Sequence, residues 1–171
     1  ARSGRTVALL FFDIDQFKRI NDSLGHTFGD AILRTAASRL MACVRDSDTV
    51  ARLGGDEFVV VLSDMARADD VPPVARKILS AIAEPMLVEG REINLSASMG
   101  AALYPKDGVD YDTLLKNADA AMYEAKEAGR NGYRFYTADM NARALEMLTM
   151  ETQLRRALER GDLLLHFQPL V

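Results

Sequence analysis

The stretch from Arg52 to Leu62 constrains the fold more than any other part of the sequence. Gly54-Gly55 separates two β-prone runs, and paired glycines favour a tight hairpin turn because both can adopt positive φ. The run from Phe58 to Leu62 is apolar at every position, which is typical of a strand covered on both faces. Asp56 and Glu57 are therefore expected where the turn enters a buried strand. Carboxylates at such a place are either solvated turn residues or ligands of a cation.

A second apolar run, from Val7 to Phe12, predicts another central strand, which ends in Asp13 and Asp15. Acidic side chains just beyond a buried strand lie at a sheet edge, where ligand sites tend to form. If the two strands are neighbours, both acidic pairs meet at one edge. Mg²⁺ takes one or two carboxylates and leaves its other positions to water and phosphate. Two metal ions at such an edge can assist an in-line phosphoryl transfer.

The rest of the sequence alternates helical and strand patterns. Helices are predicted at Gln16–His26, over about 17 residues around Ile32–Val44 with Asp30 in the first turn, at Val71–Ile82 and at Asp112–Ala128. Further strands are predicted at Thr49–Leu53, Met86–Val88, Ile93–Leu103 and Tyr133–Tyr136. This order predicts an α+β fold in which helices cover a mixed, mostly antiparallel sheet. Asp139–Arg160 is continuously helix-prone, and Gly161–Val171 reads as the start of a strand.

Composition excludes several classes of protein. The 171 residues suffice for one domain or one domain plus a fragment, with an ordinary globular composition of 49% hydrophobic and 27% charged residues. A net charge of −4 with both signs interspersed argues against a binder of long nucleic acid. No apolar run approaches the roughly 18 residues of a membrane span, so no membrane contact by this fragment is expected. The single cysteine, Cys43, fits a reducing compartment.

Three separated motifs occur along the chain. Residues Gly54 to Phe58 read Gly-Gly-Asp-Glu-Phe, Phe12 to Asp22 with Gly25-His26 and Gly29-Asp30 form a second motif, and Ala125 to Asn131 form a third. Together they resemble the three signatures of one known family, the GGDEF-domain diguanylate cyclases. The resemblance covers about residues 6–136, so residues 1–136 are expected to form the GGDEF domain. It implies a palm-like fold, shared with nucleotide cyclases, and the condensation of two GTP into cyclic di-GMP with release of pyrophosphate.

The resemblance assigns the acidic residues to catalysis. Asp13 and Asp56 would bind Mg²⁺ or Mn²⁺, and the carbonyl of Ile14 would complete the protein's share of ligands. Glu57 would either assist the second metal or deprotonate the attacking 3′-hydroxyl, and the sequence does not choose between these roles. His26 is read as a packing or hydrogen-bonding residue rather than a metal ligand.

The nucleotide contacts also follow from the resemblance. Asn21 and Asp30 would read guanine, because a carboxylate can accept from the N1–H and the exocyclic amine together. The phosphates would be held by Lys126 and Arg130, one helical turn apart, and by backbone N–H groups around Phe17 and Lys18. Each residue has a simpler alternative: Asn21 as a turn residue, Asp30 as a helix-start acid, and Lys126 and Arg130 as cations at a helix C-terminus.

Arg45-Asp46-Ser47-Asp48 resembles the family's inhibitory site, at which Arg45 and Asp48 would bind the product cyclic di-GMP. The alternative is a charged turn after a helix, with Arg45 stabilising the helix C-terminus.

The two ends of the chain depart from a simple GGDEF domain. Only Ala1–Thr6 precede the first strand, where the family carries a further segment and a helix, so a covering helix is expected to be missing. Leu154–Val171 resembles the first helix and strand of an EAL phosphodiesterase domain, without that domain's metal ligands. Residues 137–160 are thus interpreted as a linker helix and residues 161–171 as the first strand of a truncated EAL domain. The fragment is not expected to hydrolyse cyclic di-GMP.

Two functions remain open on the sequence. One is an active cyclase working as a homodimer, because one site has residues for one GTP and the product joins two. The other is a non-catalytic module that binds GTP or cyclic di-GMP and regulates an attached EAL domain. A ferredoxin-like nucleic-acid binder is disfavoured by the negative charge and the 7% aromatic content. A bacterial cytoplasmic location is expected, with membrane anchoring of the parent protein left open.

Overall fold

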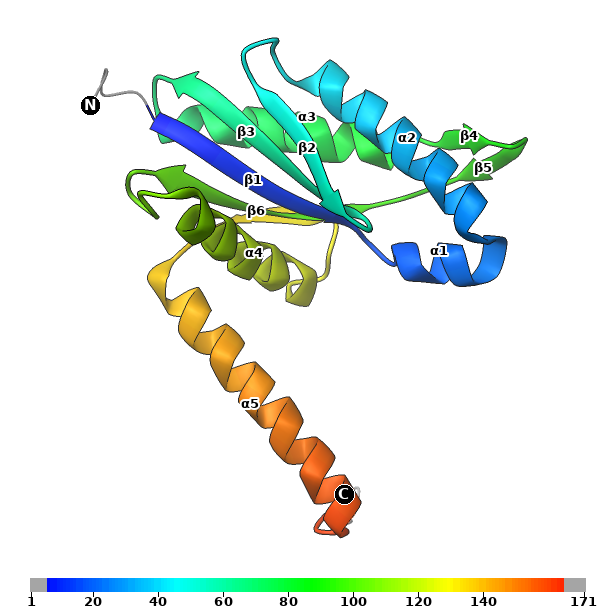
Figure 1. Ribbon diagram of the computed structural model, residues 1–171, viewed down its shortest axis with the longest axis vertical. Coiled ribbons are helices and arrows are strands. Elements are labelled where there is room, and N and C mark those ends of the chain that lie inside the picture. Colours follow the sequence, from blue (N-terminus) through cyan, green and yellow to red (C-terminus); the bar gives the residue numbers. More distant parts are fainter. Residues whose placement is uncertain (1–5, 165–171) are drawn as a thin grey trace, which may run out of the picture. The chain divides into compact units, whose positions relative to one another are not determined.

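The computed structural model describes residues 6–164, except for the side chain of Leu148, and shows the predicted α+β fold. The first of two compact units ends at Thr137 and is built on a five-stranded sheet of order β2-β3-β1-β6-β7 (Figure 1). Its strands are β1 Thr6–Ile14, β2 Thr49–Gly54, β3 Glu57–Met65, β6 Ala97–Tyr104 and β7 Gly132–Phe135. Only β6 and β7 pair in parallel, so the sheet is mixed and mostly antiparallel, as predicted.

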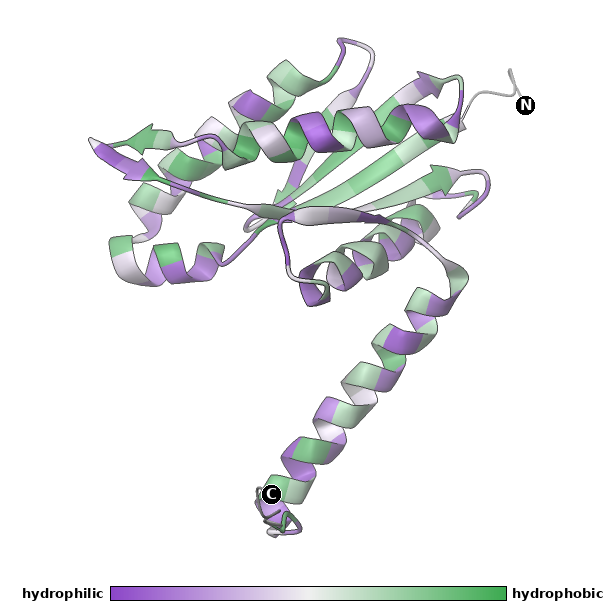
Figure 2. Ribbon diagram, turned by 180° about the vertical axis from the view of Figure 1, so that it is seen from behind, coloured by the Kyte–Doolittle hydropathy of each residue, from purple (hydrophilic) through white to green (hydrophobic). Residues whose placement is uncertain are grey.

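Helices cover both faces of the central strand β1, which explains its unbroken apolar run. Leu10 and Phe12 belong to the larger core, formed with α2 (His26–Cys43) and α3 (Val71–Ala83). Leu9 and Phe11 face the other way and pack with α4 (Tyr111–Glu127). Figure 2 shows the resulting apolar strands between more polar helix surfaces. A short 3₁₀ helix, Ala68–Asp70, leads into α3.

Helix α4 approaches β6 closely because of Gly100. A Cβ at this position would lie 1.9 Å from the carbonyl oxygen of Ala118 and 2.3 Å from the nitrogen of Met122. Both are backbone atoms of α4, so only glycine allows this approach. The close packing places the C-terminal end of α4 beside the sheet edge that carries the acidic residues.

The short helix α1 spans Phe17–Leu24 and is followed at once by α2. Gly25 separates them with φ 86°, a conformation that favours glycine. Because α2 already begins at His26, Asp30 lies in its second turn rather than the predicted first turn.

The β2–β3 hairpin forms as predicted, but its turn lies one residue later. Gly54 is the last residue of β2 and pairs with Glu57, so the turn consists of Gly55 and Asp56. Of the two glycines only Gly55 has positive φ, at 51°. The displacement follows from a register shift between Arg52 and Gly54, and Nε of Arg52 donates to the Gly55 carbonyl at 2.8 Å.

The strand predicted over Ile93–Leu103 is two strands in two different sheets. β5 (Arg91–Ile93) pairs only with β4 (Met86–Val88) in a small hairpin, whereas β6 belongs to the main sheet. Asn94–Ser96, between the two strands, form no strand. Here the Ser96 carbonyl accepts a hydrogen bond from the backbone N–H of Asp15 at 2.9 Å.

The second compact unit begins with α5, Ala138–Arg160, in the stretch predicted to be helical. Gly161–Leu164 form no strand, and the remainder of the predicted strand, residues 165–171 with His166, lies outside the described residues, as do residues 1–5 before β1. Within residues 6–164, none of the helices has the length and apolar character needed to cross a membrane.

Candidate functional site

The two acidic clusters meet at one edge of the sheet. β1 and β3 are antiparallel neighbours, and Asp13 at the end of β1 pairs directly with Glu57 at the start of β3. Side chains of directly opposed residues share a face of the sheet, with Cβ atoms about 4.5–5.5 Å apart. Asp56 precedes Glu57 in the hairpin turn and acts electrostatically on Asp13. The condition set by the sequence, that these strands be neighbours, is met.

Asp13 is largely buried and forms an ion pair with Lys126. The Nζ of Lys126 lies 2.9 Å from Oδ1 of Asp13, and the Asp13 side chain is 13% exposed. Burial raises the pKa of Asp13, the hydrogen bond and positive charge of Lys126 lower it, and the negative charges of Asp56 and Asp15 raise it again, with a net rise. Burial therefore outweighs the ion pair with Lys126 in its effect on the pKa of Asp13.

The donor set at this edge fits Mg²⁺ rather than a metal held by many side chains. Among the described residues, no group of three or more His, Cys, Asp or Glu side chains converges on one point. Mg²⁺ does not need such a cage, because it binds through one or two carboxylates and keeps water or phosphate elsewhere. Asp13, Asp56 and the Ile14 carbonyl are hard oxygen donors of this kind.

Asn21 and Asp30 lie on adjacent helices and are brought together by Gly29. A Cβ on Gly29 would lie 1.9 Å from Oδ1 of Asn21, so the α1–α2 contact is formed at the residue before Asp30. The Oδ1 atom of Asn21 is buried and has no hydrogen-bond partner among the described residues. An unsatisfied buried polar atom is uncommon in native structures and calls for an explanation. A bound ligand offering a donor supplies one.

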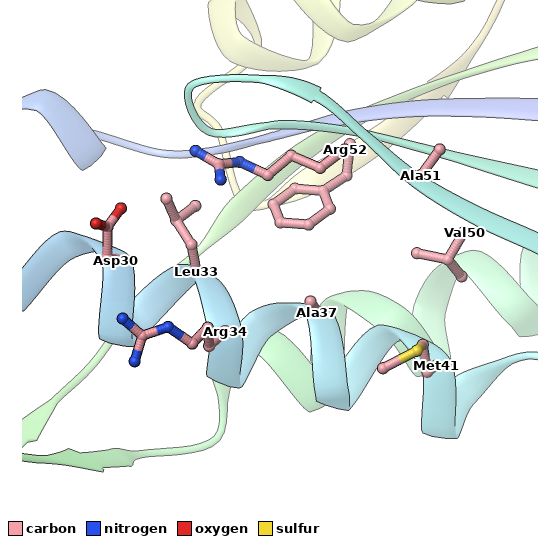
Figure 3. A pocket seen from close by; sticks show the side chains of 9 residues that line it. Asp30, Leu33, Arg34, Ala37, Met41, Val50, Ala51 and Arg52 are labelled. Carbon is pink, nitrogen blue, oxygen red and sulfur yellow. The ribbon is translucent and has the colours of Figure 1, made fainter.

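A groove of about 420 Å³ runs between α2 and β2 next to Asp30. Figure 3 shows Asp30 at one end, with the guanidinium groups of Arg34 and Arg52 nearby, and Met41 and Val50 towards the other end. Its remaining lining is apolar or small: Leu33, Ala37, Ala51 and Phe58. Charge is therefore concentrated at the end of the groove that lies nearest the acidic edge of the sheet.

Lys126 and Arg130 do not share a helical surface, contrary to the prediction. α4 ends at Glu127, and Gly129 reverses the chain with φ 113°. The backbone N–H of Arg130 donates to the Ala125 carbonyl at 3.1 Å and that of Gly129 to the Lys126 carbonyl at 3.3 Å. These two bonds form a Schellman-type helix end, which places Arg130 in a left-handed conformation beyond the helix.

Phe17 and Lys18 form the first turn of α1, as the resemblance requires. Gln16 precedes them with φ 59°, so the chain turns sharply between β1 and α1. The first N–H groups of a helix have no intrahelical partners and are free to bind an anion. The buried side chain of Phe17 anchors the start of the helix to the core, and the side chain of Lys18 is exposed to solvent.

Two further acids lie at this edge: Asp15, which the sequence placed in an acidic pair with Asp13, and Asp119, which sequence reasoning did not single out. Asp15 is buried and accepts hydrogen bonds from Ser96, Ser98 and Asn131. Asp119 lies on α4, and its pKa is raised, chiefly by burial. The positive charge of Lys126 lowers this pKa, and the negative charge of Asp13 raises it. The spacing Asp13-x-Asp15 marked Asp15 in the sequence. No local pattern marks Asp119, because it comes from a different element, α4.

Arg45 and Asp48 lie in the turn between α2 and β2, away from the acidic edge. The Asp48 carboxylate accepts from the backbone N–H of Arg45 at 3.0 Å and from that of Ser63 at 3.1 Å. Both residues line a cleft of about 490 Å³ that also contains Lys77 and Asp70. Asp48 therefore has a structural task in the turn, which the simpler interpretation anticipated, and Arg45 is exposed beside a cleft.

Comparison with known proteins adds the family context. The family model "Diguanylate cyclase, GGDEF domain" matches residues 1–132. The chain is 49% identical over 170 residues to the bifunctional diguanylate cyclase/cyclic di-GMP phosphodiesterase MucR of Pseudomonas aeruginosa, covering 99% of this chain and 25% of MucR. It is 42% identical over 168 residues to the cyclic di-GMP phosphodiesterase NbdA of the same organism, covering 98% of this chain and 21% of NbdA.

The fold is similarly matched. The X-ray structure of an EAL/GGDEF domain protein from M. capsulatus superposes with a TM-score of 0.76 at 48% identity, covering 80% of this chain and 88% of that one.

The chain spans about a quarter of the length of the curated relatives MucR and NbdA.

Proposed function

Because this chain belongs to the GGDEF family of diguanylate cyclase domains, we propose that it condenses two molecules of GTP into cyclic di-GMP and releases pyrophosphate. The proposal rests on the sheet edge at which Asp13 lies opposite Glu57 on the neighbouring strand and forms an ion pair with Lys126. A buried carboxylate with a raised pKa, beside a lysine and further acids, suits a reaction on a metal-bound triphosphate.

Asp13, Asp56 and the carbonyl of Ile14 would hold Mg²⁺, with Mn²⁺ as a substitute. The ion supplies positive charge that neutralises the phosphates and polarises the bond to be cleaved. Lys126 occupies the cation position beside Asp13 in this structure. If Asp13 held Mg²⁺ instead, the ammonium group of Lys126 would be available to contact a phosphate. Glu57 lies opposite Asp13 and fits either a metal-binding or a proton-accepting role.

Guanine would lie between α1 and α2. The unpartnered Oδ1 of Asn21 accepts from a base N–H, and the exposed carboxylate of Asp30 accepts from the N1–H and the exocyclic amine. Adenine lacks this pair of donors, so Asp30 selects guanine. The triphosphate would run from there along the start of α1, past the N–H groups of Phe17 and Lys18, towards Lys126 and Arg130.

Two chains are needed for one product. Each chain offers one set of guanine and phosphate contacts, whereas cyclic di-GMP joins two nucleotides. We therefore propose a homodimer that meets face to face across its two sites in an isologous arrangement. Product bound by Arg45 would limit turnover by holding the two domains apart. A reaction of GTP also fits a bacterial cytoplasmic location.

A second candidate is a regulatory module within a larger protein. NbdA, 42% identical to this chain, carries the name of a phosphodiesterase alone. In such a protein this domain would bind GTP or cyclic di-GMP and control an EAL domain, with residues 137–160 as the linker helix and residues 161–171 as the first EAL strand. The acidic residues of the site remain intact here, which favours the cyclase.

Incubation with GTP and Mg²⁺, with the product identified by mass, tests the proposal. The wild-type chain should form cyclic di-GMP and pyrophosphate. Asp13→Asn and Asp56→Asn should each lower turnover at least about 100-fold, because each removes a charged metal ligand, an effect of several kcal/mol. Asp22→Asn, which removes an exposed acid of α1, is the matched control and should retain turnover.

The outcomes separate the candidates. Binding of GTP by the wild type without any product favours the regulatory module. Near-normal turnover of Asp13→Asn, with unchanged melting temperature, contradicts the metal assignment.

A further inference from the structure

Asp15 is a buried carboxylate to which the proposed chemistry assigns no role. It follows β1 directly, stands two residues after Asp13 and is 6% exposed. Burying a carboxylate is costly unless hydrogen bonds replace its lost water. Asp15 has such bonds, and they come from three separate parts of the chain.

Two of the bonds hold the carboxylate to the sheet. The hydroxyl of Ser98, a fully buried residue of β6, donates to Oδ1 at 2.7 Å. The hydroxyl of Ser96, just before β6, donates to Oδ2 at 2.6 Å. Because Ser98 pairs with Asp13 across the β1–β6 ladder, Asp15 is anchored beside the proposed metal ligand rather than directed into solvent.

The third bond reaches the turn after α4. The backbone N–H of Asn131 donates to Oδ2 of Asp15 at 3.2 Å. Arg130 and Asn131 both have positive φ, 63° and 48°, which is unfavourable for residues other than glycine. The helix-end bond from Arg130 to Ala125 holds this turn from one side and Asp15 holds it from the other.

The backbone of Asp15 also leads directly into α1. Its backbone N–H donates to the Ser96 carbonyl at 2.9 Å, and Gln16 then reverses the chain with φ 59° before Phe17 starts the helix. One residue therefore joins the start of α1 to the turn that carries Arg130. These two segments carry the donors proposed to hold the phosphates.

We propose that Asp15 is a positioning residue for the β and γ phosphates of GTP. Its carboxylate holds the Arg130–Asn131 turn against the start of α1, and so sets the separation between the Arg130 guanidinium and the backbone donors of Phe17 and Lys18. This inference rests on the proposed function. Asp15 then contributes to phosphate binding and not to guanine binding. It does so through the hydrogen bonds that its carboxylate accepts and not by ligating a metal.

Two substitutions separate these causes. Asp15→Ala removes all three accepted hydrogen bonds. Asp15→Asn keeps an oxygen for Ser96 and Asn131 and turns an amide towards Ser98, whose hydroxyl can accept. A positioning role is therefore largely rescued by asparagine, whereas a metal-ligand role is not. Ser98→Ala loosens the carboxylate while preserving its charge, and serves if Asp15→Ala does not fold.

The experiment measures the affinity of the full chain for GMP and for 3′-deoxy-GTP, which cannot condense, by calorimetry with Mg²⁺. The ratio of the dissociation constant for GMP to that for 3′-deoxy-GTP reports how much the outer phosphates contribute to binding, and it falls when that contribution is lost. We expect Asp15→Ala to lower this ratio about tenfold, as for the loss of a charge-assisted contact, and to leave the affinity for GMP within about twofold. Asp15→Asn should remain within about threefold of the wild-type ratio, and Ser98→Ala should fall between the two variants.

Amide exchange of Asn131 in the free protein gives a readout independent of nucleotide. Faster exchange in Asp15→Ala, together with the lower ratio, supports the inference. Faster exchange with an unchanged ratio overturns it while the proposed function stands. An equal fall for Asp15→Ala and Asp15→Asn also overturns it, in favour of a metal ligand. A wild type that binds GMP and 3′-deoxy-GTP equally would instead contradict the proposed function, whatever the exchange of Asn131.

Discussion

At the scale of single residues, the candidate site depends on positions at which no larger side chain fits. Gly29 is an example, because its absent side chain is what admits the amide of Asn21 at 1.9 Å from an ideal Cβ position. The ring of Phe17 lies on the same side, at 3.0 Å. A methyl group here would displace a flexible amide sooner than a buried ring. The residue therefore controls a proposed guanine contact without touching the base.

Gly29→Ala should weaken GTP binding about tenfold, since one hydrogen bond worth roughly 1–1.5 kcal/mol is lost when Asn21 moves. Calorimetric titration with 3′-deoxy-GTP measures the effect. Gly132→Ala is the control, because its Cβ would meet its nearest atom only at 3.6 Å. Equal affinity for Gly29→Ala and the wild type would mean that Asn21 does not contact the base.

Arg45→Ala should weaken binding of cyclic di-GMP more than tenfold while sparing 3′-deoxy-GTP, because a charge-assisted contact contributes about 1.5–3 kcal/mol. Titration of both ligands checks this. Asp48 is unsuitable as the test position, since its carboxylate holds the backbone N–H groups of Arg45 and Ser63. Unchanged affinity would leave Arg45 as a charge near the end of α2.

At the scale of elements, α2 and α3 stabilise each other's C-terminal ends. The last carbonyls of a helix lack intrahelical donors. Lys77 of α3 donates to the carbonyls of Ala42 and Cys43 at 3.3 and 3.0 Å. Arg39 of α2 donates to the carbonyl of Ala81 and, beyond the end of α3, to that of Pro85, both at 2.8 Å, and also to that of Glu84. The helix layer that carries Asp30 is thus joined by reciprocal polar contacts as well as by its core.

Arg39→Met should lower the free energy of unfolding by about 1.5–3 kcal/mol, because several carbonyls lose a charged donor while the apolar stem is kept. Urea denaturation measures the change. The control is Arg34→Met, at an exposed position earlier on the same helix, which is expected to shift stability by less than about 0.5 kcal/mol. A similar loss for both variants would contradict the capping role of Arg39.

At the scale of the whole molecule, the proposed reaction exceeds what one chain contains. The first compact unit carries the residues proposed to bind one nucleotide, and the second unit begins with α5. α5 exposes large apolar side chains, including Leu145, Met150, Leu154 and Leu158. The chain spans about a quarter of the length of the curated relative MucR.

Specific activity should rise with protein concentration in the dilute range, approaching first-order dependence on the chain, because two sites must meet for each product. Turnover measured across a dilution series, with the mass of the species determined at each point by light scattering, checks this. Constant specific activity in a monomeric sample would contradict the two-chain proposal.

The sequence by itself predicted the two central strands, the β2–β3 hairpin, the main helices and the meeting of the acidic residues at one sheet edge. Apolar runs at Val7–Phe12 and Phe58–Leu62 predict buried central strands, because only a strand covered on both faces tolerates unbroken hydrophobicity. The glycine-rich motif predicts the hairpin because few other sequences reverse a strand so tightly. Local patterns suffice for these features, since their causes lie within neighbouring residues.

Tertiary structure alone decided how those elements meet. The break at Asn94–Ser96 and the displaced turn at Gly55-Asp56 depend on register with neighbouring strands, which no local pattern encodes. The position of Arg130 beyond its helix, by contrast, has a local cause, because Gly129 ends α4 at positive φ with two backbone hydrogen bonds. Asp15 has partners 81, 83 and 116 residues away in sequence, and only the folded chain brings them to one carboxylate. Burial then makes those distant hydrogen bonds necessary, because an unpaired charge in the interior would cost more than the fold can sustain.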